Sequence, residues 1–175
     1  MNQMKVYVYD PTTTDSLSKV RGIGRYLQIL KENLPADTVF TSQVKDVPHD
    51  SIFLNPFINF IRPPLITKRF AKKQIGVIHD VIPLQFPEHF PIGIRGKLNV
   101  FRNKQALRNY DTIITVSKTS KDHIVQVLGI ESAKIKVVYT CLPQIFSAQI
   151  RTKASSIKTP YFIYVGDATW NKNLV

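Results

Sequence analysis

A histidine and an aspartate stand side by side where a predicted strand ends. The apolar segment 74–79 (QIGVIH) ends on His79, and Asp80 begins the loop that follows. In parallel sheets ligands bind at the carboxyl ends of strands, where a histidine can position a substrate or transfer a proton. We therefore expect His79 and Asp80 to belong to a catalytic site, with a histidine satisfied by local hydrogen bonds as the alternative. No metal site is expected, because the nearby His89 has no matching ligand spacing.

Two glycines open a helical pattern after the first predicted strand. Backbone N–H groups at a helix N-terminus favour an anion such as a phosphate, which makes Gly22, Gly24 and the neighbouring Arg25 candidate phosphate-binding residues. The dinucleotide fingerprint GxGxxG is not matched, because Leu27 occupies the third glycine position and a ten-residue loop precedes the segment. Turn formation and phosphate binding both remain open interpretations.

The net charge of +12 is concentrated in the later part of the chain. Residues 1–61 carry six basic and six acidic side chains, so the whole excess begins at Arg62. Such an excess attracts polyanions, namely nucleic acid, anionic lipid headgroups or phosphorylated ligands. The composition does not distinguish among these three classes.

Residues 62–73 (RPPLITKRFAKK) predict a short basic helix that could lie on an anionic membrane. An ordinary solvated face is the alternative. In residues 94–109 the basic side chains form two opposed rows, which predicts a solvated helix. The cations expected to face a membrane or an acceptor are Arg62, Lys68, Arg69, Lys72 and Lys73.

Helical patterns alternate with short apolar runs that lack polar alternation, which predicts an α/β domain with a parallel sheet. One helix follows Gly22 and ends before Pro35, another covers about 94–109, and a third is capped by Ser117 or Ser120 and ends at Gly129. Residues 80–93, which contain three prolines, predict a loop. The predicted strands are 4–9, 38–41, 51–54, 74–79, 112–116, 134–138 and 161–165.

The sequence divides into a domain over 1–146, a polar linker over 147–160, and the first strand and turn of an incomplete second domain over 161–175. Cys141 is the only cysteine, which excludes a disulfide framework and favours a reducing, cytoplasmic location. No apolar run approaches the ~18 residues that a membrane-spanning helix needs.

Several segments occur together in the order and spacing of one family. The chain resembles the N-terminal half of retaining GT-B glycosyltransferases of family GT4, particularly bacterial mannosyltransferase-like members. The resemblance implies a Rossmann-like N-terminal domain with helices on both faces of its sheet, facing a second domain across a cleft. The matching segments are GIGRYL at 22–27, VIHDVIPLQFPEHF at 77–90, TIITVSKTSKDHI at 112–124, KIKVVY at 134–139 and YFIYVGDATWNKNL at 161–174.

The resemblance also implies roles for individual residues. Gly22 and Gly24 would border the donor phosphates, His79 would position the transferred sugar, and Lys172 would contact the donor diphosphate. Many members carry an arginine soon after the glycine that matches Gly166, whereas Asp167 stands there in this chain. The acidic EX7E motif would lie beyond the last residue given, so the chain alone is expected to be inactive.

Such enzymes transfer a hexose from a nucleotide-diphosphate sugar with retention, without a metal or other cofactor. For this chain the resemblance implies mannose transfer to a glycan or lipid-linked acceptor, in the cytoplasm or at the inner face of the plasma membrane, with no specific nucleic-acid partner. The alternative is a non-catalytic basic α/β domain that binds a phosphorylated ligand or nucleic acid.

Overall fold

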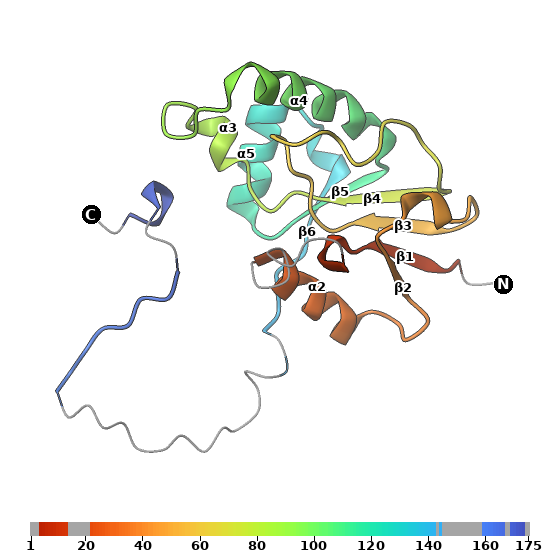
Figure 1. Cartoon of the computed structure of the whole chain (residues 1–175), viewed down its shortest axis with the longest axis horizontal. Coiled ribbons are helices and arrows are strands. Elements are labelled where there is room, and N and C mark those ends of the chain that lie inside the picture. Colours follow the sequence, from red (N-terminus) through yellow and green to blue (C-terminus); the bar gives the residue numbers. More distant parts are fainter. Residues whose placement is uncertain (1–3, 14–21, 143, 145–158, 167–168, 174–175) are drawn as a thin grey trace.

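A six-stranded parallel sheet forms the centre of the computed structural model, which describes residues 4–13, 22–142, 144, 159–166 and 169–173 (Figure 1). The strand order is β2-β1-β3-β4-β5-β6, and every neighbouring pair is parallel. The predicted parallel α/β class is confirmed. The strands are β1 (Val6–Tyr9), β2 (Val39–Thr41), β3 (Ile52–Asn55), β4 (Lys73–Val77), β5 (Thr112–Thr115) and β6 (Ile135–Val137).

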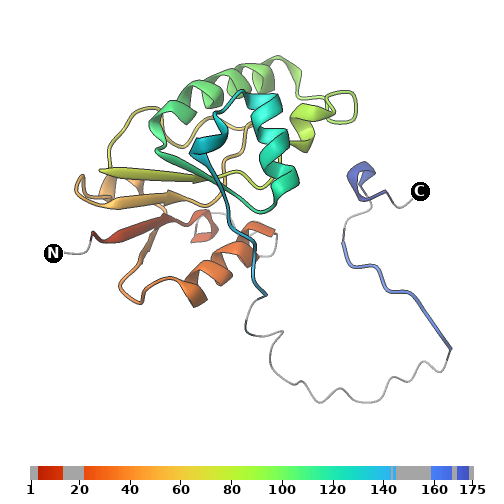
Figure 2. The same ribbon diagram turned by 180° about the vertical axis from the view of Figure 1, so that it is seen from behind.

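Helices cover both faces of the sheet. Helix α2 (Gly22–Asn33) lies on one face, whereas α4 (Gly93–Ala106) and α5 (Lys118–Leu128) lie on the opposite face (Figures 1 and 2). This is the Rossmann-like arrangement that the family resemblance implied, and it agrees with the parallel α/β sheet predicted from the apolar strands. A strand covered on both sides has no solvent-facing row, so it needs no polar alternation.

Successive residues of β1, β3 and β5 enter two different hydrophobic clusters. Val8 and Leu54 pack with Leu27 of α2 in one cluster, while Phe53 and Ile113 belong to the cluster on the α5 side. Side chains alternate between the two faces along a strand, so these three strands supply both clusters.

The α5 helix has the caps that its sequence predicts. The Ser117 hydroxyl oxygen accepts a hydrogen bond from the Ser120 backbone N–H at 3.0 Å. At the other end Gly129 adopts a left-handed conformation with φ 67°, and its N–H donates to the Val125 carbonyl at 3.0 Å. Both ends therefore satisfy backbone groups that a helix leaves unpaired.

The basic helix predicted over 62–73 is wrong. Residues 62–72 form turns and irregular backbone, and Lys73 already belongs to β4. The buried Gln74 side chain accepts hydrogen bonds from the backbone N–H groups of Phe70 at 2.9 Å and Ala71 at 3.1 Å. These side-chain bonds compete with helical ones, and the buried Ile66 holds the segment against the core.

Two further expectations differ from the structure. The loop predicted over 80–93 contains one helical turn, α3 (Ile82–Gln85), because Pro83 fits the first turn of a helix. The strand predicted over 161–165 is absent, since this exposed segment pairs with no strand among the described residues. Most of the linker predicted over 147–160 lies outside the described residues, so that boundary stays a prediction.

Gly76 in β4 lies where a side chain would collide with the core. A Cβ added there would stand 2.6 Å from Ile58 Cδ1 and 3.0 Å from the Tyr110 ring. Because overpacking a filled core costs about 1–3 kcal/mol, we expect Gly76→Ala to lower the free energy of unfolding by about that amount. Denaturant titration measures this change. Gly22→Ala is the control, since its Cβ would meet no atom within 4 Å, and an equal loss in both variants would contradict the prediction.

Candidate functional site

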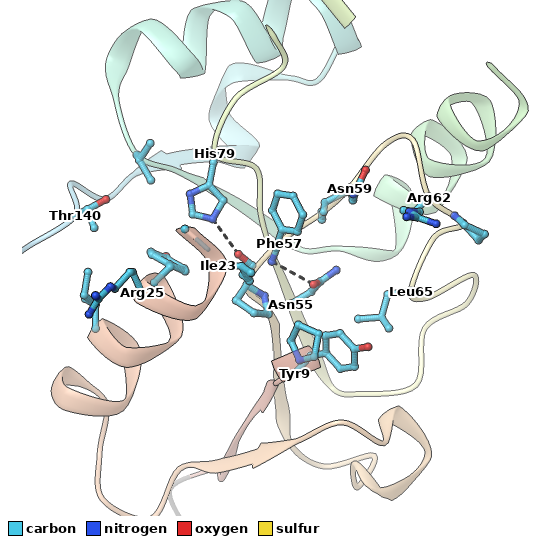
Figure 3. A pocket seen from close by; sticks show the side chains of 18 residues that line it. Tyr9, Ile23, Arg25, Asn55, Phe57, Asn59, Arg62, Leu65, His79 and Thr140 are labelled. Carbon is cyan, nitrogen blue, oxygen red and sulfur yellow. Dashed lines mark hydrogen bonds between the residues drawn. The ribbon is translucent and has the colours of Figure 1, made fainter. Parts of the chain in front are cut away.

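A large cavity of about 1050 Å³ lies at the carboxyl ends of the strands (Figure 3). The chain moves from β1 to β2 on one side, then crosses to β3 on the other side of β1. Such a reversal of strand order opens a crevice between the loops that leave the two strands, which is where open α/β sheets bind ligands. Tyr9 at the end of β1 and Asn55 at the end of β3 both line the cavity.

His79 lies in the wall of this cavity, as its sequence position predicts. Its Nε2 is 3.1 Å from the Pro56 carbonyl oxygen (Figure 3). Its ring meets the Tyr26 ring edge-on, with the ring centres 4.7 Å apart. Burial lowers the pKa of His79, against smaller opposing effects of the Pro56 carbonyl and the Asp80 charge. A carbonyl only accepts, so Nε2 carries the proton in the neutral ring, which leaves Nδ1 as an acceptor.

Asn55 is a buried cavity residue that sequence reasoning missed. Its Nδ2 donates to the Tyr110 hydroxyl at 2.8 Å, and its Oδ1 accepts from the Phe57 N–H at 3.3 Å. Burial raises the pKa of Tyr110 to about 12, with the Asn55 hydrogen bond acting in the opposite direction. The neutral pair fixes the Asn55 amide and the start of the loop that follows β3. Asparagine directly after an apolar run is the signal that could have indicated it.

The N-terminus of α2 borders the same cavity. Gly22 and Arg25 line it, whereas Gly24 belongs to α2 without being among the lining residues. Arg25 and Thr140 lie on one side of the cavity, while Arg62 and Leu65 lie on the other (Figure 3). A helix N-terminus with an adjacent guanidinium is an environment that favours a phosphate.

Asp10 fixes the described segment that directly follows β1. Burial would raise the pKa of Asp10, but hydrogen bonds from Thr12 and Lys31 outweigh it and lower the pKa below its ordinary value. The Thr12 N–H donates to Asp10 Oδ1 at 2.9 Å, and Lys31 Nζ lies 2.9 Å from Oδ2. This carboxylate begins the short helical turn η1 (Pro11–Thr13) and ties it to α2. The cavity wall at Pro11 is thereby anchored.

Two other predicted site residues, Asp80 and Lys172, do not line the large cavity. Asp80 is exposed and accepts from the Ile82 N–H at 3.1 Å, and it borders a smaller cavity of about 150 Å³ that it shares with His79. Lys172 lies in η6 (Trp170–Lys172) and is not among the residues that line either cavity. The neighbouring Trp170 stacks on His89 with ring centres 3.8 Å apart.

The basic residues predicted to face a membrane or an acceptor do not lie together in the structure. Arg62 lines the large cavity, whereas Arg69 forms an ion pair with Asp111. Lys68, Lys72 and Lys73 are exposed and do not line it. Within the described residues no group of three His, Cys, Asp or Glu side chains could hold a metal ion.

The cavity combines two chemical environments. The rings of Tyr9, Tyr26 and Phe57 and the amides of Asn55 and Asn59 line it. Apolar rings with a few placed polar groups suit an organic ligand that has both hydroxyl groups and C–H faces, such as a sugar. The α2 N-terminus and Arg25 supply positive potential at the same cavity, so a sugar and a phosphate could be held next to each other.

The lowered pKa of His79 gives a pH dependence of stability with a definite sign. Below pH about 6.5 the unfolded chain binds a proton that the folded state resists, so the free energy of unfolding falls as the pH falls. We expect His79→Gln to reduce this fall between pH 6.5 and 5, measured by denaturant titration at each pH. The exposed His49 supplies the control variant His49→Gln. A pH profile of His79→Gln that matches the unaltered chain would contradict the assignment.

One protein-family model matches most of this domain. The model described as Glycosyltransferase Family 4 matches residues 20–143, which include α2, His79 and all strands from β2 to β6. The chain belongs to Glycosyltransferase Family 4. The family resemblance inferred from the sequence is confirmed, and the Rossmann-like sheet agrees with an N-terminal domain of a GT-B glycosyltransferase.

A curated protein is similar in sequence to part of this chain. The O-antigen chain mannosyltransferase RfbU of Salmonella typhimurium is 28% identical over 103 residues, which cover 59% of this chain and 27% of the relative. The chain thus spans about a quarter of the length of that relative. No solved structure matches the chain.

Proposed function

We propose that the protein is a retaining glycosyltransferase that transfers a hexose, specifically mannose, from a nucleotide-diphosphate sugar to a glycan or lipid-linked acceptor. The chain would form the N-terminal domain that holds the acceptor. One observation carries the proposal: the large cavity lies where the strand order reverses and collects His79, aromatic rings and the α2 N-terminus. The mannosyltransferase name of the relative supports the choice of sugar.

On the acceptor side, the chain supplies shape and hydrogen bonds. The exposed Phe57 ring offers a flat apolar face, while the Asn55 amide is already oriented by Tyr110. The neutral His79 offers an acceptor atom for a sugar hydroxyl, so it would orient a reactant without carrying charge. Orientation of this kind lowers the barrier because the bound groups have already lost their rotational freedom.

On the donor side, the chain supplies positive potential. Negative charge develops on the departing diphosphate during sugar transfer, and fixed cations and N–H dipoles stabilise it. Arg25 and the first N–H groups of α2 would supply this stabilisation. The departing phosphate could then take the acceptor proton, so His79 would act as a positioning residue and not as the base.

Binding of a mannose-containing oligosaccharide tests the acceptor proposal directly. Phe57→Ala removes a ring from the cavity wall, and we expect it to weaken binding about tenfold, because a lost aromatic contact costs about 1–1.5 kcal/mol. Isothermal titration calorimetry measures the affinity. Phe162→Ala is the matched control, since Phe162 is exposed and lies outside the cavity.

Two outcomes would contradict this function. The first is oligosaccharide binding that Phe57→Ala and Phe162→Ala weaken equally. The second is binding of duplex DNA or inorganic phosphate with no binding of any oligosaccharide, which would favour the non-catalytic basic domain. Titrations at low and at physiological salt separate such electrostatic binding, because affinity for a polyanion falls steeply with salt.

A further inference from the structure

Helix α4 exposes an apolar strip on its outer side. Ile94, Leu98 and Phe101 are 88%, 47% and 58% exposed. Their spacing of four and three residues places them on one side of the helix. A contiguous exposed apolar strip marks a surface that contacts something else.

The inner side of α4 is polar for a structural reason. Asn103 Nδ2 lies 2.8 Å from the Arg62 carbonyl oxygen and 3.3 Å from that of Phe60, while Asn99 Nδ2 donates to the Ile61 carbonyl at 2.9 Å. These carbonyls belong to a segment that forms neither a strand nor a helix, so side-chain amides satisfy them. The fold thus explains the inward asparagines, but it gives the outward apolar residues no role.

Basic side chains border the apolar strip on both sides. At 100° per residue, one row lies on one edge of the strip and the second row on the other edge. The helix contains no acidic residue. The first row is Arg95 and Arg102, and the second is Lys97, Lys104 and, just past the helix, Arg108. The two opposed rows seen in the sequence therefore flank one exposed apolar surface.

We propose that α4 lies on an anionic lipid bilayer, with Ile94, Leu98 and Phe101 inserted and the two basic rows among the headgroups. A bilayer presents negative charge on every side of an inserted strip, which matches cations on both edges. No helix in the described part of the chain is long and apolar enough to cross a membrane. An apolar strip between two basic rows suits a helix that lies in the plane of the bilayer surface.

We assign the membrane contact to α4 and not to residues 62–73, where the sequence predicted it. Ile66 is buried, and Leu65 and Phe70 pack against the core, so none of the three can insert into lipid. Arg69 is neutralised by Asp111. Three exposed lysines of that segment remain, and they provide a charge-matched control surface: Lys68, Lys72 and Lys73.

The contact also bears on the proposed transfer. The α4 asparagines hold the loop that contains Asn59 and Arg62, which line the large cavity. Docking on the outer face of α4 would bring that wall of the cavity close to the bilayer, where a lipid-linked acceptor resides. This consequence rests on the proposed function, whereas the membrane contact itself does not.

Co-sedimentation with vesicles tests the contact without any sugar substrate. The probes are vesicles of phosphatidylcholine alone and of phosphatidylcholine with phosphatidylglycerol. We expect the chain to bind the anionic vesicles and to be released by about 0.5 M salt, where the Debye length shrinks. Arg95→Glu/Lys97→Glu/Arg102→Glu should lower the partition coefficient about tenfold or more. Lys68→Glu/Lys72→Glu/Lys73→Glu should lower it much less, although both variants remove the same six units of charge.

A third variant separates insertion from charge. Ile94→Ser/Leu98→Ser/Phe101→Ser keeps every cation and should also lower partitioning about tenfold, since apolar insertion adds to the electrostatic attraction. Thermal unfolding verifies that each variant folds. We expect all of them to fold, because every altered side chain is exposed.

Three results would overturn the proposal. The first is equal loss in the two charge variants, which would mean diffuse attraction by net charge. The second is full binding by the serine variant. The third is that the unaltered chain does not bind vesicles but forms a dimer in sedimentation velocity, and that the serine variant is a monomer. This result would mean that the strip binds a second copy of the chain.

Discussion

The reversal of strand order between β1 and β3 is the constraint on which the site depends. The loops that leave these two neighbouring strands must diverge, because β1 leads toward α2 and β3 leads toward the opposite side. Open α/β sheets bind ligands in the space between such loops, so the position of the cavity follows from the topology. Residues from three further elements then reach the same space: His79 after β4, Val116 after β5 and Thr140 after β6.

Buried polar side chains give the cavity a fixed shape. The Asn55 amide is held by the Tyr110 hydroxyl, and Tyr110 can lie over the sheet only because Gly76 has no side chain. On the other wall, one amide of Asn103 serves several carbonyls of the loop after β3. Each of these groups would cost free energy if left unpaired in the interior. The hydrogen bonds that satisfy these buried groups therefore also fix the walls of the cavity. The bonds of Asn103 to the loop after β3 place the polar side of α4 toward the interior.

Local signals predicted most elements, whereas side-chain hydrogen bonds and burial against the core decided the conformation of residues 62–73 and the orientation of α4. The caps of α5 at Ser117 and Gly129 follow from residue chemistry within one turn, and the strand-end position of His79 follows from apolar patterning. The segment 62–73 has a helical composition, but the Gln74 side chain and burial of its apolar residues hold it in turns. Likewise the orientation of α4 depends on carbonyls some forty residues away, which Asn103 reaches. No local pattern contains that information.

Hydrogen–deuterium exchange of the chain with inorganic diphosphate and with a mannose-containing oligosaccharide tests the central claim that one cavity holds both the donor diphosphate and the acceptor. The first N–H groups of α2 have no helical acceptor, so a bound diphosphate should slow exchange at residues 22–25. The oligosaccharide should slow exchange at residues 55–59, which line the opposite wall. Protection confined to residues 161–173, or absent from both segments at saturating ligand, would contradict the account.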